Sequence, residues 1–136
     1  MVRKIEHIGI AVKDLSASNK LFQDILGVAP YKEELVQSEN VLTSFFQVGE
    51  SKIELLQATS PDSAIAKFLE KNKEGMHHIA FDVEDIFSEI ERLKGLGYVM
   101  IHDDPKAGAD DKIIAFMHPK SSNGVLIELC QDRFKK

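Results

Sequence analysis

The sequence predicts an α+β fold in which two tandem βαβββ units form a curved mixed sheet around a metal-binding cleft. Two observations carry this prediction. The order of strand-like and helix-like segments repeats, and His and Glu recur at matching places. The His7 to His78 offset is 78 − 7 = 71, and the Glu54 to Glu128 offset is 128 − 54 = 74. Such nearly constant offsets indicate an internal duplication, which could direct four ligands at one point.

The first half-repeat covers about residues 1–59 and opens with a strand over residues 5–12. In that strand the larger apolar side chains alternate with His7 and small residues, so His7 shares its face with residues that leave space. Apolar residues at helical spacing predict a helix over residues 16–26. The remaining strands of this half are predicted over residues 29–37, 41–48 and 52–58, with the Gly49-Glu50 pair as a hairpin turn.

The second half-repeat covers about residues 75–136 and follows the same plan. Its first strand, over residues 76–83, carries His78 on the face of the small residue Ala80. A helix is predicted over residues 85–96. The last three strands are predicted over residues 98–102, 113–117 and 125–131.

The two half-repeats are joined by a predicted helix over about residues 61–73. Ser60 at the cap and Pro61 at the first helical position are typical of a helix start. We therefore expect one domain over residues 1–136, made of two halves and this connecting helix.

Composition narrows the function classes. The 136 residues carry 17 basic and 22 acidic side chains, a net charge of −5, and no run of Lys and Arg that could follow a phosphate backbone. We expect no nucleic-acid partner. The apolar stretches have the length of strands, so no membrane span is predicted. A single cysteine rules out an internal disulfide framework, and a cytoplasmic protein is expected.

The repeated His and Glu residues predict a metal site. A single strand histidine or glutamate is usually structural, but four ligand-type side chains at two equivalent pairs of positions are not explained by chance decoration of a surface. Two imidazoles and two carboxylates suit one divalent ion such as Co²⁺, Zn²⁺, Ni²⁺ or Mn²⁺. The predicted metal ligands are His7, Glu54, His78 and Glu128.

Strand parity removes several neighbours from this site. Gln57 and Gln131 each lie three residues after a glutamate, hence on the opposite strand face, and are expected to be scaffold residues. His77 alternates away from His78 and is expected to be structural. Cys130 shares the face of Glu128 and is expected to be a small buried apolar residue.

At this point several segments resemble a known family. They are His7–Leu15, Ile53–Leu56, Ser60–Leu69, Gly75–Ala80, His118–Ser121 and Gly124–Leu129. Over nearly its full length the chain resembles the vicinal oxygen chelate (glyoxalase/bleomycin-resistance/dioxygenase) superfamily, and within it the methylmalonyl-CoA epimerase family. The connecting helix and the segment His118-Pro119-Lys120 are the most specific of these matches.

The resemblance implies that His7, His78 and Glu128 are metal ligands, with Glu54 as a ligand or a base. It also implies inversion at C2 of methylmalonyl-CoA, by proton abstraction and reprotonation through a metal-stabilised enolate. Glu128 is the expected first base, and the candidates for the second are Glu54 and a metal-bound water. The implied partners are an acyl-CoA substrate and a second copy of the chain in a homodimer.

The sequence departs from the family in two places. Some epimerases carry a glutamate where this chain has Thr43, whose hydroxyl is no base at neutral pH. In addition, residues 106–112 replace a Gly-rich loop with a segment containing Asp110 and Asp111, which would repel coenzyme A phosphates if it bordered their channel. Lys112 and Lys120 could compensate, or could be ordinary surface lysines.

Two alternatives use the same fold. A glyoxalase I-like lyase (lactoylglutathione lyase type) would act on a thiol hemithioacetal, but residues 8–12 lack the arginine that such enzymes offer to glutathione. A non-catalytic protein that binds a small molecule would not need two His and two Glu at equivalent positions. Metal uptake and solvent-hydrogen exchange at C2 separate these alternatives from an epimerase.

Overall fold

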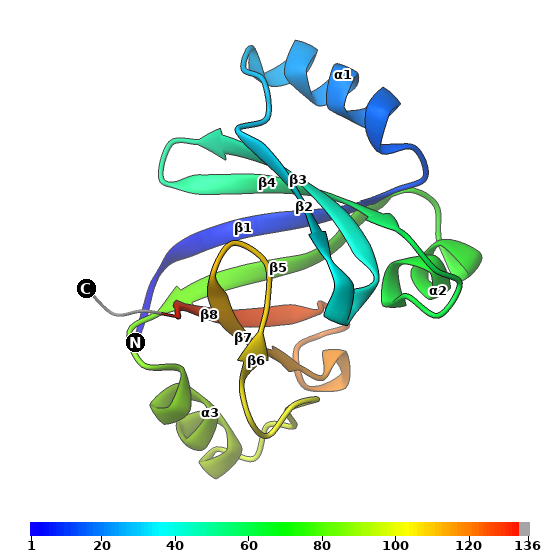
Figure 1. Ribbon diagram of the computed structural model, residues 1–136. Helices are drawn as coiled ribbons and strands as arrows, with labels where there is room; N and C mark the ends of the chain where they lie inside the picture. Colours follow the sequence, from blue (N-terminus) through cyan, green and yellow to red (C-terminus); the bar gives the residue numbers. More distant parts are fainter. Residues whose placement is uncertain (134–136) are drawn as a thin grey trace. The chain divides into compact units, whose positions relative to one another are not determined.

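A computed structural model describes residues 1–133, and its element order confirms the predicted repeat. Each half contributes a strand, a helix and three further strands, with one helix between the halves (Figure 1). The chain divides into two compact units. The N-terminal unit is residues 7–77, and the C-terminal unit is residues 1–6 together with the residues from His78 onward. The single-domain organisation over residues 1–136 stays a prediction, and its last three residues lie outside the described part.

The N-terminal unit contains a sheet of strand order β2-β3-β4-β1. The strand β4 pairs parallel to β1 and antiparallel to β3, and β3 pairs antiparallel to β2. One face of this sheet packs on α1, through a core that includes Leu15, Phe46 and Leu55. The elements are β1 (Val2–Val12), α1 (Leu15–Leu26), β2 (Lys32–Val36), the 3₁₀ turn Gln37–Glu39, β3 (Val41–Val48), β4 (Ser51–Ala58) and α2 (Ala64–Lys71).

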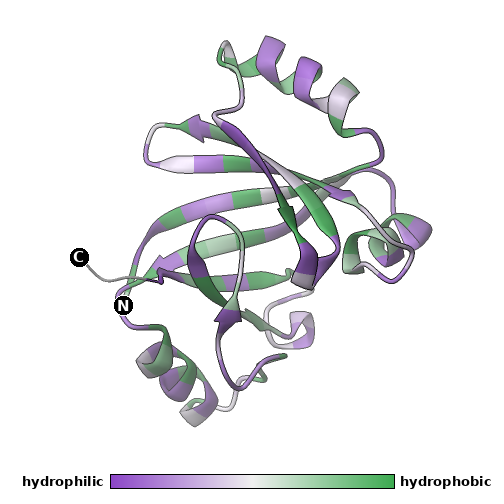
Figure 2. Cartoon of the chain, viewed as in Figure 1, coloured by the Kyte–Doolittle hydropathy of each residue, from purple (hydrophilic) through white to green (hydrophobic). Residues whose placement is uncertain are grey.

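The C-terminal unit repeats this pattern with strand order β5-β8-β7-β6. The strand β8 pairs parallel to β5 and antiparallel to β7. The core packs α3 on the sheet through Ile86, Ile90 and Leu129. Figure 2 shows the alternation of hydrophilic and hydrophobic residues along the strands that permits one face to bury against a helix. The elements are β5 (Gly75–Val83), α3 (Ile86–Gly95), β6 (Lys106–Ala107), β7 (Lys112–Met117), the 3₁₀ turn Pro119–Ser121 and β8 (Ile127–Asp132).

The two glutamines behave as the predicted scaffold residues. Gln57 Oε1 accepts a hydrogen bond from the first amide of α1, Leu15 N, at 2.7 Å. Gln131 Oε1 accepts one from the first amide of α3, Ile86 N, also at 2.7 Å. The last strand of each half therefore supplies an acceptor for a helix N-terminus whose amides have no partner within the helix.

An aspartate completes each of these helix starts. Asp14 is the N-cap of α1 and accepts from Ala17 N, and Asp85 is the N-cap of α3 and accepts from Phe87 N and Ser88 N. The Asp and Gln together fix where each helix begins, and the same device occurs in both halves.

The strand predicted over residues 98–102 is wrong. The segment runs along β7 with hydrogen bonds from Ile101 N to Phe116 O and from His118 N to Val99 O. It forms only an isolated bridge, Met100 to Met117, and the strand β6 begins later, at Lys106. The intervening Asp103-Asp104-Pro105 interrupts the pairing, because proline has no amide to donate.

The predicted start of the connecting helix is also wrong. The N-cap of α2 is Ser63, whose hydroxyl accepts from Ile65 N at 3.1 Å, and not Ser60. Residues 60–63 form a turn instead, in which Ser63 N donates to Ser60 O. Ser63 is 1% exposed, so the buried hydroxyl satisfies a helix amide that water could not reach.

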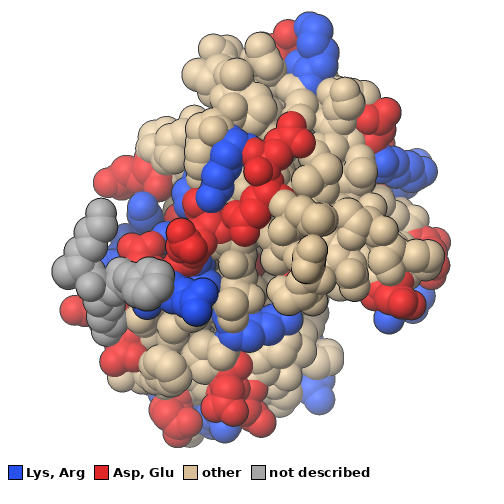
Figure 3. Space-filling model, viewed as in Figure 1, with Lys and Arg blue, Asp and Glu red and all other residues tan. Residues whose placement is uncertain are grey.

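Among residues 1–133 no helix is both long enough and apolar enough to span a membrane. Figure 3 shows Lys and Arg side chains interspersed with Asp and Glu on the visible face, without one continuous basic surface. The absence of a nucleic-acid partner stays a prediction.

Candidate metal-binding and catalytic site

His7 and Glu54 form a buried pair in the N-terminal unit. Gly9 of β1 lies opposite Glu54 of β4 in the strand pairing. His7 is two residues before Gly9 and projects to the same side of β1, so His7 and Glu54 lie on the same face of the sheet. His7 Nδ1 lies 3.0 Å from Glu54 Oε2, and each residue is 4% exposed. Two groups that prefer water are therefore held together out of it.

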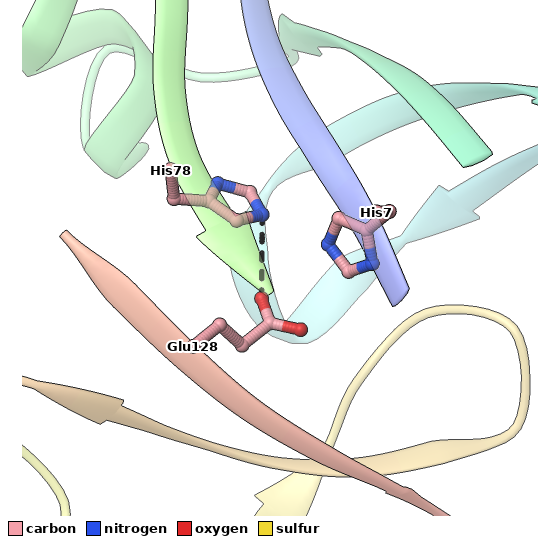
Figure 4. Close-up of side chains that lie close together, drawn as sticks. All are labelled: His7, His78 and Glu128. Carbon is pink, nitrogen blue, oxygen red and sulfur yellow. Dashed lines mark ion pairs between the residues drawn. The ribbon is translucent and has the colours of Figure 1, made fainter. Parts of the chain in front are cut away.

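His78 and Glu128 form the corresponding pair in the C-terminal unit. Figure 4 shows His78 on β5 and Glu128 on β8 turned toward each other, with His78 Nε2 3.4 Å from Glu128 Oε1. His78 is 7% exposed and Glu128 is 5% exposed. The edge of the His78 ring meets the Phe116 ring at 5.7 Å between centroids, which fixes the orientation of the imidazole.

Small side chains flank the two histidines along their own strands, as the strand pattern predicts. In the N-terminal unit Gly9 and Ala11 share the face of His7, and Ala11 is fully buried. In the C-terminal unit the fully buried Ala80 lies opposite Glu128 in the strand pairing. Neither residue type extends far from the backbone, so the ligand-type side chains are the groups that project from these strands.

The donor set of each pair fits a divalent ion. A buried carboxylate and imidazole cost free energy unless they are paired or coordinate a metal. Nitrogen and oxygen donors of this kind bind Zn²⁺ and its borderline neighbours. The four predicted ligands are all among the described residues whose side chains could hold a metal ion. The structure brings the four predicted ligands together as two pairs, His7 with Glu54 and His78 with Glu128.

The sequence did not single out Glu6 or Asp82, which are both buried carboxylates of the C-terminal unit. Glu6 is 2% exposed and Asp82 is 4% exposed. Arg3 Nε donates to Asp82 Oδ2 at 2.8 Å, which neutralises that carboxylate. Asp82 lies two residues from Ala80 on the face of His78, so strand parity alone could have identified it.

Cys130 is a buried thiol, as expected. It is fully buried and its Sγ lies 3.5 Å from Phe81 O. Burial raises the pKa of the Cys130 thiol strongly, and the negative charges of Glu128, Glu6 and Asp82 raise the pKa further. The thiolate that could bind a metal or act as a nucleophile is thereby disfavoured.

The other histidines have structural contacts. His77 meets Phe68 of α2 edge-on, with ring centroids 5.0 Å apart, and burial lowers its pKa. His102 Nδ1 accepts from Phe116 N at 3.3 Å. His118 Nδ1 accepts from Lys120 N at 3.1 Å and caps the 3₁₀ turn that follows.

The segment 106–112 forms a tight turn between β6 and β7. Asp110 and Asp111 both have positive φ, 59° and 55°, a conformation that Asp tolerates better than most residues. Lys112 Nζ is hydrogen-bonded to Asp132, so this lysine is neutralised within its own unit. Lys120 is exposed.

Thr43 lies on β3, with a buried hydroxyl. The residue is 1% exposed, and its Oγ1 has no hydrogen-bond partner.

Comparison with known proteins identifies the family. A family model described as the Glyoxalase/Bleomycin resistance protein/Dioxygenase superfamily matches residues 6–116. The chain belongs to this superfamily. The match includes residues 6–12 of β1 and all of β5, and with them His7 and His78.

Three superfamily members show how close the similarity is. The ethylmalonyl-CoA/methylmalonyl-CoA epimerase of Cereibacter sphaeroides is 40% identical over 133 residues, which cover 96% of this chain and 99% of that protein. A variant of Streptomyces coelicolor methylmalonyl-CoA epimerase, in complex with 2-nitronate-propionyl-CoA, superposes with a TM-score of 0.93 at 33% identity. That match covers 97% of this chain and 96% of the other.

A methylmalonyl-CoA epimerase in complex with methylmalonyl-CoA and NH4+ also has a TM-score of 0.93, at 33% identity, with 97% and 96% of the two chains covered. The likeness extends over nearly the whole of this chain. The fold predicted from the repeat is therefore that of the superfamily, and its members in these comparisons include epimerases of acyl-CoA thioesters.

Proposed function

We propose that this chain is a metal-dependent epimerase that inverts C2 of methylmalonyl-CoA. The observation that carries the proposal is the pair of buried His–Glu contacts at equivalent positions of the two half-repeats. The full-length similarity to proteins named methylmalonyl-CoA epimerase supports the choice of substrate.

The proposed ligands of one divalent ion are His7, Glu54, His78 and Glu128. When bound, such an ion supplies Lewis-acid stabilisation of the negative charge that develops on the thioester oxygen as C2 loses its proton. The protein's own contribution is to hold these side chains out of water, where electrostatic interactions are stronger than at an exposed surface.

Glu128 is the proposed first proton carrier. Its carboxylate takes the C2 proton of one epimer, and its protonated form returns a proton to the same side of the planar enolate in the reverse direction. Phe116 lies directly opposite Glu128 in the β7–β8 pairing and covers this region with an aromatic ring. Glu54 is the proposed fourth ligand and the sequence-based candidate for the second carrier.

The proposed partners are an acyl-CoA substrate and a second copy of the chain. The named complexes with 2-nitronate-propionyl-CoA and methylmalonyl-CoA support the first. We propose a homodimer, which light scattering on the purified protein would test. A cytoplasmic location is proposed because the chain has a single cysteine, which cannot form an internal disulfide.

Solvent-hydrogen exchange tests the proposal. The protein is purified without added metal, its metal content is measured, and it is reconstituted with Co²⁺, Zn²⁺, Ni²⁺ or Mn²⁺. Incubation in D₂O with (2R)- or (2S)-methylmalonyl-CoA should then give metal-dependent deuterium at C2 and interconversion of the epimers. The Glu128→Gln variant should lose the exchange.

Two results would contradict the proposal. Failure to take up any divalent ion stoichiometrically would favour a binding protein over an enzyme. Turnover of a thiol hemithioacetal, with no deuterium entering methylmalonyl-CoA, would assign the chain to the lyases.

A further inference from the structure

Inversion at a carbon requires a proton carrier on each side of the planar enolate. Glu128 is proposed for one side. Glu54 Oε2 lies 3.0 Å from His7 Nδ1, and Glu6 directly precedes His7 in the sequence. The second carrier must act on the side of the enolate opposite Glu128, and a carboxylate on the face of His7 that is not a proposed ligand is a candidate for it.

The strand pairing places Glu34 on the face that carries His7 and Glu54. Glu34 of β2 lies opposite Thr43 of β3, and Thr43 lies opposite Leu56 of β4. Leu56 is two residues from Glu54 and therefore on the same face. Side chains directly opposite in antiparallel strands project to the same side, so Glu34 belongs to this face as well.

Side-chain contacts on β2 and β3 agree with this assignment. Lys32 Nζ lies 5.0 Å from the centre of the Phe45 ring and 3.4 Å from Glu34 Oε1. These three residues therefore share one face. The next residue, Phe46, meets Phe22 of α1 on the other face, with ring centroids 6.4 Å apart.

Glu34 is the remaining carboxylate on this face. In the described strands of the N-terminal unit, alternation places two glutamates on the face of His7, Glu54 and Glu34. Glu33 projects to the opposite face, where its carboxylate accepts from Asn19 of α1 at 3.3 Å.

The Thr43 hydroxyl marks where the Glu34 carboxylate could act. Thr43 Oγ1 has no hydrogen-bond partner although the residue is only 1% exposed. A hydrogen bond to the Glu34 carboxylate would pair this hydroxyl. The Cβ atoms of directly opposite residues lie about 4.5–5.5 Å apart, a gap that a glutamate side chain can bridge.

We infer that Glu34 is the second proton carrier of the proposed epimerase, held in place by a hydrogen bond from the Thr43 hydroxyl. This inference rests on the proposed function. With substrate bound, the Glu34 carboxylate turns from Lys32 to Thr43 and takes the C2 proton as the C–H electron pair passes into the enolate. Protonated Glu128 then gives its proton to C2 on the other side. The reverse reaction exchanges the two roles, and proton exchange of both carboxyl groups with solvent water restores the starting protonation states before the next turnover.

Glu34→Gln and the matched control Glu33→Gln test the assignment. Both remove one negative charge from β2, but only Glu34 lies on the face of Glu54. Each variant is incubated in D₂O with each C2 epimer separately, and deuterium incorporation and inversion are measured independently. Removing one of two acid–base groups should slow interconversion by about 10²–10⁴-fold. Glu34→Gln should still exchange the C2 hydrogen of one epimer through Glu128, without inverting it.

The double variant Glu34→Gln/Thr43→Glu provides a gain of function. It returns a carboxylate to the same face one strand away, and should recover interconversion and the lost exchange. Glu33→Gln should behave as the unmodified protein.

Several outcomes would overturn the inference. They are interconversion by Glu34→Gln within threefold of the unmodified rate, equal loss of exchange from both epimers, and no recovery in the double variant. Thermal unfolding of each variant establishes that it is folded. If the unmodified, metal-loaded protein shows no exchange from either epimer, the proposed function itself fails; if only Glu34→Gln is unaffected, the proposed function stands and the carrier is another carboxylate.

Discussion

The Gln131→Ala variant should lower the stability of the protein without changing its affinity for a divalent ion. Gln131 Oε1 accepts the first amide of α3, Ile86 N, at 2.7 Å. Ile86 is fully buried and Gln131 is 6% exposed, so water cannot replace the lost acceptor. Leaving a buried amide unpaired costs about 1–3 kcal/mol. At roughly 4 °C per kcal/mol for a chain of this length, the unfolding midpoint should fall by about 4–12 °C.

The equivalent change in the other half should cost less. Gln57 is partly exposed and accepts from Leu15 N at 2.7 Å, so water can take over part of its role in Gln57→Ala, and a cost of about 1 kcal/mol is expected. The exposed Gln23 of α1 provides the control, because Gln23→Ala makes the same chemical change without a buried acceptor and should stay within about 0.5 kcal/mol.

The assay pairs urea unfolding with calorimetric titration of a divalent ion. Gln131 lies three residues from Glu128 and projects to the α3 side of the sheet, so ion affinity should be unchanged while stability falls. Loss of ion binding in Gln131→Ala would show that the strand parity is wrong. Stability equal to that of Gln23→Ala would show that the contact with Ile86 does not cap α3.

Three further predictions concern the same units. The Cys130 thiol, whose pKa burial raises, should react with a disulfide reagent at pH 8 only after unfolding, and rapid labelling of the folded protein would contradict its burial. The hydrogen bond from Arg92 lowers the pKa of Glu89. The stabilisation that this ion pair gives the folded state is therefore present above the unfolded pKa of about 4.3 and is lost as pH falls through the lower folded pKa. Arg92→Ala should be less stable than the unmodified protein at neutral pH, and acid-titration unfolding curves should show this difference in stability shrinking as pH falls. Gly108→Ala would place a Cβ 2.8 Å from Ile114 Cγ2 and should cost about 1–3 kcal/mol in urea unfolding, whereas Gly95→Ala at the end of α3, with no neighbour within 4 Å, should be neutral or stabilising.

Much of the fold was predictable because it depends on local patterns. Alternation along β1 and β5 predicts that His7 and His78 share a face with small residues. Gln57 lies three residues after Glu54 in β4, so alternation also predicts that the two project to opposite faces. These conclusions need only the geometry of one strand. The segment 98–102 has strand composition as well, but a strand also needs an uninterrupted partner, and Pro105 and the acidic residues before it end the pairing.

The missed site residues depend on pairing between strands. Nothing in the local sequence around Glu34 distinguishes it from Glu33, because both are glutamates in a polar strand. Only the register of β2 against β3 shows that Glu34 faces Thr43 and Glu33 faces Ser44. Register follows from turn geometry and from contacts made across the sheet, which alternation within one strand does not contain.

The duplication also explains why a second carrier, if it lies in the strands, should come from the N-terminal unit. Phe45 lies opposite Glu54 and Phe116 lies opposite Glu128, so the two half-repeats have the same strand register at these positions. Two residues before each phenylalanine stand Thr43 and Ile114, and their partners on the neighbouring strands are Glu34 and Lys106. The equivalent strand position therefore holds a carboxylate beside a hydroxyl in the N-terminal unit and an ammonium beside an apolar side chain in the C-terminal unit. A carboxylate can accept a proton from carbon at neutral pH, whereas a protonated lysine cannot. Duplication would thus have supplied two equivalent positions, of which only the one at Glu34 has the chemistry of a base.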